Sequence, residues 1–360
     1  MSSSPRPNVS EHSTVIPPPR VPEEVTAAWL SDVLNQKVKS IELSKQFHST
    51  ASKLFCTVTY DDEGAAESSR PTHICIKGGF SPELLAALPF LAQIYQRETD
   101  FFSKIAPSLR MSLPKVWYAD HGVLVMNDLA YAGCVFGDPL DTWSVERVKS
   151  GVEQLAVLHA DTWNVQEEKY PCITSDYPEL VLNLMQQYDE FINAKDGPPV
   201  LDYLRDKKRA IAAVEKYHRT RNPRFRCLIH CDPHVGNAYL MRDGQVRFID
   251  FQLVHISSAF HDLAYFVGSA LSIEDRRAHE DEIIDYYLNS LAEQGGPRLA
   301  RDEEVVAEYA HSFMSGYSWV VTPYSLQSME KVHTMTKRFM AAIQDHKTIE
   351  LLEALPEVAT

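Results

Sequence analysis

Apolar residues alternate with polar ones along the first third of the chain and then return at helical spacing. Period-two or β-branched runs predict strands at residues 39–43, 54–60, 72–77, 116–118 and 123–126. Residues 61–70 read as a polar turn between two of these strands. Apolar positions three and four apart predict helices at residues 23–34 and 82–104. This part is therefore expected to be a strand-rich unit with a long inserted helix.

From residue 144 onward the pattern is mainly helical. It predicts helices at residues 144–162, 179–194, 200–219, 274–293, 302–319 and 326–347. One β island, residues 227–251, interrupts them. The simplest layout is a disordered tail over residues 1–22, a β-rich lobe over 23–126 and a larger helical lobe over 127–360, an α+β architecture.

Composition and charge narrow the class of protein. The 360 residues are 44% hydrophobic and 23% charged, as in an ordinary globular enzyme. The net charge of −14 argues against nucleic acid or an anionic membrane as the main partner, and it would suit a cationic substrate. No stretch approaches the ~20 apolar residues of a membrane helix, and the Ser- and Pro-rich tail is neither a signal peptide nor an anchor. Six cysteines without a CxxC pair favour a reducing, cytoplasmic setting. Oligomeric state is open.

The β island carries the candidate chemistry. Asp243-Gly244 between two apolar runs is a strong hairpin signal. If these two residues form the loop, Tyr239 pairs with Phe248, and the same register places Asn237 opposite Asp250. Side chains directly opposed in this way have Cβ atoms roughly 4.5–5.5 Å apart. An amide and a carboxylate at that separation suit Mg²⁺, which takes a few protein oxygens and keeps water or phosphate oxygens for the rest.

A third acidic residue favours this metal site over the alternative, in which Asn237 and Asp250 only cap the hairpin. Asp232 precedes Pro233 in a turn that no regular helix continues. In phosphoryl transfer an Asp accepts the proton of the acceptor hydroxyl, while an Asn and a second Asp hold Mg²⁺. His230 and His234 also have the spacing of a zinc-binding helix, but Pro233 disrupts that helix.

Two segments make the sequence resemble a known superfamily. His230-Cys231-Asp232-Pro233-His234-Val235-Gly236-Asn237, followed by Phe248-Ile249-Asp250-Phe251-Gln252, is similar to the catalytic and metal-binding segments of aminoglycoside phosphotransferases and choline kinases. The Asp-Phe-Gln triplet is closest to the CHK kinase-like, or ecdysteroid kinase-like, branch. The resemblance extends over residues 260–266 and over Leu158-His159-Ala160. It implies a two-lobed, protein-kinase-like fold of the aminoglycoside phosphotransferase type, with ATP and Mg²⁺ as cofactors.

The resemblance also implies roles for residues of the first lobe. Lys77, at the tip of an apolar strand, matches the lysine that contacts the nucleotide phosphates, and Glu98 matches its acidic partner. Met126 and Asp128 fall in the segment that resembles the adenine-binding hinge. In the second lobe, His230 is expected to orient the catalytic loop through hydrogen bonds, and Asp262 is expected to brace that loop.

Two departures from the superfamily pattern are visible. The loop over residues 44–53, which should cover the phosphates, contains no glycine, although glycine lets a backbone approach phosphate closely. Hydroxyl groups of Ser49 and Thr50 are the expected substitutes. Cys231 stands where glycine is common, so its backbone is expected in a conformation that a side chain disfavours.

These expectations add up to a small-molecule kinase. The acceptor would be a hydroxyl-bearing metabolite, held by the helical lobe through aromatic residues such as Tyr265, Tyr317, Trp319 and Tyr324. An alternative is a kinase-fold protein with lost or altered chemistry, either a nucleotide-binding regulator or another metabolic enzyme. A protein kinase is disfavoured, because no activation segment ending in Ala-Pro-Glu follows Phe251.

Overall fold

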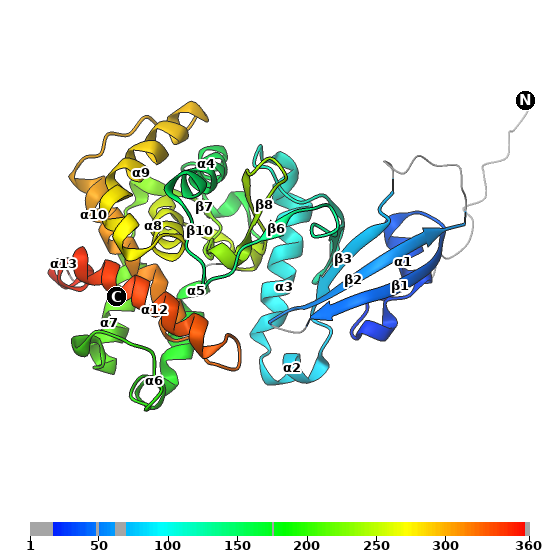
Figure 1. Ribbon diagram of the computed structural model, residues 1–360, viewed down its shortest axis with the longest axis horizontal. Helices are drawn as coiled ribbons and strands as arrows, with labels where there is room; N and C mark the ends of the chain where they lie inside the picture. Colours follow the sequence, from blue (N-terminus) through cyan, green and yellow to red (C-terminus); the bar gives the residue numbers. More distant parts are fainter. Residues whose placement is uncertain (1–16, 48–49, 62–69, 175, 357–360) are drawn as a thin grey trace, which may run out of the picture.

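The computed structural model describes residues 17–47, 50–61, 70–174 and 176–356. Figure 1 shows a small lobe built on a sheet beside a larger helical lobe, with helix α3 between them. Residues 1–16 of the predicted tail and 62–69 of the predicted turn lie outside the described residues. In the described part of the chain, no helix is long and apolar enough to cross a membrane.

The small lobe is an antiparallel sheet whose strands, within the described residues, follow the order β1-β2-β3-β5-β4. Their bounds are β1 Val38–Phe47, β2 Ser52–Tyr60, β3 His73–Gly78, β4 Val116–Asp120 and β5 Val123–Asn127. Period-two alternation buries Leu54 and Cys56 of β2 on one face, where they join a core that includes Trp29 of helix α1 (Ala27–Leu34). The predicted strands are confirmed, and β1 runs further than predicted.

The long helix predicted over residues 82–104 is wrong in one respect. The segment forms helix α2 (Pro82–Ala87), helix α3 (Phe90–Asp100) and the π-helical turn η3 (Phe101–Ile105). The break falls at Leu88, whose φ of −131° and ψ of 74° are not helical. Pro89 explains it, because the proline ring disfavours the α conformation in the preceding residue. The break lets α3 take its own direction along the sheet.

The large lobe is helical, as predicted, with several helices divided by short 3-10 turns. Its helices are α4 Val145–Asp161, α5 Tyr177–Leu184, α6 Tyr188–Ile192, α7 Lys207–Arg219, α8 Ala259–Ala270, α9 Ile273–Glu293, α10 Glu303–Ser312, α11 Tyr317–Val320, α12 Met329–Asp345 and α13 Thr348–Ala354. The 3-10 turns of the chain are η1 Pro22–Glu24, η4 Ala106–Ser108, η5 Glu167–Lys169, η6 Met185–Gln187, η7 Asp202–Leu204, η8 Pro223–Phe225, η9 Val235–Asn237, η10 Phe251–Leu253 and η11 Phe313–Gly316. Helix α8 is buried along its whole length, which suits its apolar composition on all sides.

In the described residues, the β island contributes to two small antiparallel sheets in the large lobe, one of two strands and one of three. Strand β7 (Arg226–Ile229) pairs with β10 (His255–Ser258), and β8 (Ala238–Leu240) lies between β6 (Val135–Phe136) and β9 (Val246–Phe248). Segments distant in sequence thereby meet next to α8.

The predicted hairpin register is wrong by one residue. Tyr239 pairs with Arg247 rather than with Phe248, and Ala238 pairs with Phe248. The N–H of Met241 donates to the carbonyl oxygen of Gln245. The loop therefore contains three residues and not two, with Gly244 in the left-handed conformation at φ 84°. Consequently Asn237 accepts its backbone hydrogen bond from Ile249 instead of lying opposite Asp250.

Candidate active site

The candidate catalytic loop, residues 230–237, is anchored by one buried carboxylate from α8. Asp262 accepts hydrogen bonds from the backbone N–H of His230 at 2.7 Å and of Cys231 at 2.8 Å. The ring of His159 on α4 donates to the same carboxylate at 3.1 Å. Burial by itself would raise the pKa of Asp262, but the hydrogen bond from His159 and the nearby histidines lower it below its ordinary value. Asp262 therefore remains an anion that holds the start of the loop.

Cys231 has the unfavourable backbone predicted for it, with φ at 76°. A residue with a Cβ atom pays roughly 1–2 kcal/mol for this left-handed conformation. Both of its backbone polar groups are held, because its N–H donates to Asp262 and its carbonyl oxygen accepts from His261 at 2.9 Å. The surrounding hydrogen bonds keep the strained turn in place.

His230 links the loop to the strand that leads to Asp250. Its Nε2 donates to the carbonyl oxygen of Ile249 at 2.9 Å, and its Nδ1 accepts from the N–H of Asp232 at 3.3 Å. These roles require the neutral ring, and burial lowers the pKa of His230 accordingly. The geometry makes His230 a positioning residue.

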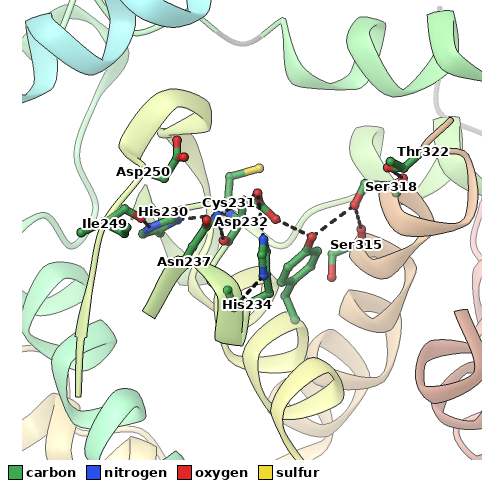
Figure 2. A network of polar contacts seen from close by, with 12 residues as sticks. His230, Cys231, Asp232, His234, Asn237, Ile249, Asp250, Ser315, Ser318 and Thr322 are labelled. Atoms are coloured by element: carbon green, nitrogen blue, oxygen red, sulfur yellow. Dashed lines mark hydrogen bonds and ion pairs between the residues drawn. The ribbon is translucent and has the colours of Figure 1, made fainter. Parts of the chain in front are cut away.

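Asp232 has both carboxylate oxygens oriented by neighbouring side chains (Figure 2). The hydroxyl of Tyr265 donates to Oδ1 at 2.5 Å, and Nδ2 of Asn237 donates to Oδ2 at 3.0 Å. The side chain stays 27% exposed, which leaves it open to the cleft. Burial raises the pKa of Asp232 to about 7, although hydrogen bonds from Tyr265 and Asn237 act against this shift. A carboxylate with such a pKa accepts a proton effectively near neutral pH.

Asn237 and Asp250 carry the amide and carboxylate oxygens that were expected to bind magnesium. Both N–H groups of the Asn237 amide are used, one on the carbonyl oxygen and one on the carboxylate of Asp232, so its oxygen Oδ1 remains for another partner. Asp250 has a left-handed backbone, with φ at 70°, at the start of the turn after β9. Both residues line one cavity with Asp232. These oxygens fit the partial protein coordination that Mg²⁺ accepts.

The ion pair between Lys77 and Glu98 expected from the sequence is present and buried. Nζ of Lys77 lies 2.8 Å from the Glu98 carboxylate and 2.9 Å from Oδ1 of Asp250. Burial would lower the pKa of Lys77, but the two carboxylates raise it well above its ordinary value. For Asp250, burial is outweighed by the lysine ammonium groups, which lower its pKa to about 2. Both ions stay charged, and β3, α3 and the β9 turn meet at this point.

Three adjoining cavities run from the sheet to the helical lobe in the described residues. The sheet cavity, of about 280 Å³, is lined among others by Phe55, Lys77, Met126 and Asp250. The loop cavity, of about 310 Å³, includes Asp232, Asn237 and Asp250. The helix cavity, of about 150 Å³, includes Asp232, Tyr265 and Trp319. Asp250 therefore lines the first two cavities and Asp232 the last two, so the cleft is continuous.

Of the remaining residues predicted for the site, some line the cavities and others do not. Thr50 lines the loop and helix cavities, whereas Ser49 lies outside the described residues. Asp128 is not among the residues that line the sheet cavity, and its carboxylate accepts from the N–H of Tyr131. Of the aromatic residues predicted to hold the acceptor, Tyr265 and Trp319 line the helix cavity. By contrast, the Tyr317 hydroxyl contacts that of Tyr188, and Tyr324 donates to a backbone carbonyl oxygen.

One contact escaped the sequence interpretation. Tyr265 was expected to face the acceptor, and it also holds Asp232. A signal for this was available, because Tyr265 follows Asp262 by three positions on a helix, and residues at that spacing share one face. Figure 2 shows the polar contacts extending from Asp232 toward Ser318 on α11.

Comparisons with known proteins agree with this fold. The profile of the ecdysteroid kinase-like family matches residues 51–295, and curated proteins yield no match. The choline kinase from Cryptosporidium parvum Iowa II has a TM-score of 0.53 at 12% identity, covering 87% of this chain and 90% of that one. The Plasmodium vivax ethanolamine kinase has a TM-score of 0.51 at 14% identity, covering 85% and 82%. An amicoumacin kinase in complex with AMP-PNP and Ca²⁺ has a TM-score of 0.50 at 13% identity, covering 86% and 89%. The predicted two-lobed kinase-like fold is confirmed.

Proposed function

Since the chain belongs to the ecdysteroid kinase-like family, we propose that it is a phosphotransferase that moves the γ-phosphate of ATP to a hydroxyl group of a small molecule. The observation that carries this proposal is the continuous cleft. Lys77 lines its sheet side, Asp250 lines its centre and Asp232 lines the side toward the helical lobe. A nucleotide and an acceptor can thus meet between the two carboxylates.

Each residue has a role that follows from its position. Lys77, held by Glu98, would contact the nucleotide phosphates. Asn237 and Asp250 would hold Mg²⁺, which neutralises charge on the phosphates when it is bound. Asp232 would align the acceptor hydroxyl and take its proton while the new O–P bond forms and the bond from the γ-phosphorus to the ADP oxygen breaks. No covalent enzyme intermediate is required.

The acceptor side favours a small molecule that is largely apolar around its hydroxyl. Leu180, Val181 and Trp319 contribute to the wall of the helix cavity, and Asp232 is the carboxylate among the described residues that line it. Aromatic rings and a carboxylate also suit an organic cation. The solved kinases named for choline and ethanolamine support testing amino alcohols first. The proposed domain roles are nucleotide binding by residues 23–126 and acceptor binding by residues 127–360.

A thermal-shift measurement with Mg·ATP, followed by a screen for ADP release over hydroxyl-bearing metabolites, tests the proposal. ATP should raise the thermal midpoint, because a ligand of the native state stabilises it by mass action. Asp250→Ala should abolish turnover of any acceptor found, while the protein stays folded. Nucleotide binding with no acceptor in a broad screen would favour a regulator instead. Full turnover by folded Asp250→Ala would contradict the metal assignment.

A further inference from the structure

Lys53 is a second cation on the cleft face of the sheet. In the antiparallel ladder its Cα partner on β3 is Lys77. Its neighbours Leu54 and Cys56 show which way β2 alternates, since Leu54 joins the core on the opposite face. Lys53 therefore projects with Lys77, and directly opposed residues have Cβ atoms roughly 4.5–5.5 Å apart.

The ammonium group of Lys53 has no direct partner among the residues that the structure describes, although it lies close enough to Asp250 to lower the pKa of that carboxyl. Lys77 has two carboxylates, Glu98 and Asp250, within 2.9 Å of its Nζ atom. By contrast, Lys53 makes no ion pair or hydrogen bond with any residue that the structure describes. Like charges directly opposed across strands destabilise a sheet. A partly buried ammonium group opposite Lys77 is best explained by an anionic ligand that binds in the cleft.

Lys53 also occupies the point at which two cavities join. Among the described residues, Lys53, Gly236 and Asp250 line both the sheet cavity and the loop cavity. Any group that passes from a nucleotide in the first cavity to an acceptor beside Asp232 in the second must cross this junction. Lys53 also closes the segment 44–53, which contains no glycine to bring backbone N–H groups close to phosphate.

We propose that Lys53 binds the terminal phosphates of the nucleotide and replaces, with one side chain, the positive end that a glycine-rich loop would supply through its backbone. The proposal rests on the proposed function and adds to it a phosphate-contacting residue on β2. The two lysines would have different roles. Lys77 is held in place by Glu98 and Asp250. Lys53 has no such ion pair among the described residues, so its side chain can move with the phosphate that is transferred.

The dependence of affinity on the number of phosphates tests the role of Lys53. Dissociation constants of the Mg²⁺ complex of ATP, and of AMP, are measured for the wild type, Lys53→Met, Lys53→Arg and the control Lys39→Met, which removes an exposed lysine from β1. A charged hydrogen bond lost from the complex should weaken ATP binding by Lys53→Met about 10- to 100-fold. AMP binding should stay near the wild-type value. Lys53→Arg should retain most of the ATP affinity, and Lys39→Met all of it.

The outcomes separate this proposal from the proposed function. Unchanged ATP affinity in Lys53→Met overturns the role of Lys53, as does an equal loss for AMP and ATP. Failure of the wild type to bind any adenine nucleotide overturns the proposed function itself. AMP binding reports that each variant is folded, and Lys53→Gln gives the same comparison if Lys53→Met does not fold.

Discussion

At the scale of single residues, the site depends on how one carboxylate is oriented. Asp232 has a hydrogen bond on each oxygen, from Tyr265 and from Asn237, and its backbone N–H is held by His230. None of these partners is charged, so burial dominates and the pKa of Asp232 rises to about 7. The carboxylate is thereby fixed in direction while it keeps its basicity.

Asp232→Asn should leave nucleotide binding intact and reduce turnover about 10²–10⁴-fold, the usual contribution of a positioned proton acceptor. The substitution keeps the shape of the side chain and removes its charge. Turnover of the identified acceptor is measured beside the ATP dissociation constant. Unchanged turnover would remove Asp232 from the mechanism, and an equal loss of ATP affinity would make its role structural.

Tyr265→Phe should lower turnover about 10- to 100-fold, because it removes a hydrogen bond to a charged group. ATP affinity should not change, since Tyr265 lines the helix cavity and not the sheet cavity. Tyr309→Phe is the matched control, because that buried tyrosine lies on α10 and lines none of the three cavities. Equal rates for both variants would show that the contact with Asp232 has no catalytic value.

At the scale of elements, helix α8 determines where the candidate catalytic loop lies. One turn of it supplies Asp262 and His261, which hold the backbone of residues 230 and 231. His159 of α4 donates to Asp262 and accepts from the hydroxyl of Tyr287 on α9, which extends this support through the core. The loop is therefore positioned by packing between helices that are distant in sequence.

Asp262→Asn should destabilise the protein by about 1–3 kcal/mol for each buried donor that loses its acceptor. An amide has one acceptor atom where the carboxylate has two, so at least one N–H of the loop is left unsatisfied. Asp281→Asn, at an exposed ion pair with Arg301, is the control and should cost less than ~1 kcal/mol. Urea denaturation measures the free energy of unfolding of both variants. Equal stability of the two variants would contradict the bracing role of Asp262.

At the scale of the whole molecule, buried neutral histidines connect folding to pH. His218, His255 and His261 lie around the ring of Tyr177, at centroid distances of 5.7, 5.3 and 5.9 Å. Burial lowers the pKa of each, to about 4 for His261, and the proximity of the neighbouring rings contributes for His218 and His261. Protonation of this cluster is incompatible with the native packing.

Stability should therefore fall as the pH drops from 7 to 5. The unfolded histidines bind protons near pH 6.5 and the folded ones do not, so the unfolded state is favoured below that pH. A histidine whose pKa is about 4 in the folded protein lowers the free energy of unfolding by about 2 kcal/mol when the pH falls from 6.5 to 5. Asp232 acts in the opposite direction, because its raised pKa lets the native state take up a proton below pH 7. Urea unfolding at pH 7.5 and 5.0 measures the balance, and equal or greater stability at pH 5.0 would contradict it.

The sequence by itself determined the local features of this protein. Period-two alternation and β-branched runs predicted the strands, because alternation depends only on backbone geometry. Asp232 and Asn237 were also evident from residue types, whereas the strain at Cys231 was expected from the resemblance to a superfamily in which glycine is common there. By contrast, the break at Leu88 was missed although Pro89 is a local signal for it.

Only the tertiary structure decided the hairpin register and the contacts between elements. Asp243-Gly244 suits a loop of either two or three residues, since Gly244 adopts a left-handed backbone in both, so packing makes the choice. A slip of one residue should turn the side chain of Asp250 to the face opposite Asn237, its predicted partner. The left-handed backbone at Asp250 then changes the direction of the chain. The contacts of Tyr265 with Asp232, and of Asp250 with Lys77, join residues far apart in the chain. No local pattern encodes such pairs, because their free energy is gained only when the lobes and helices pack together.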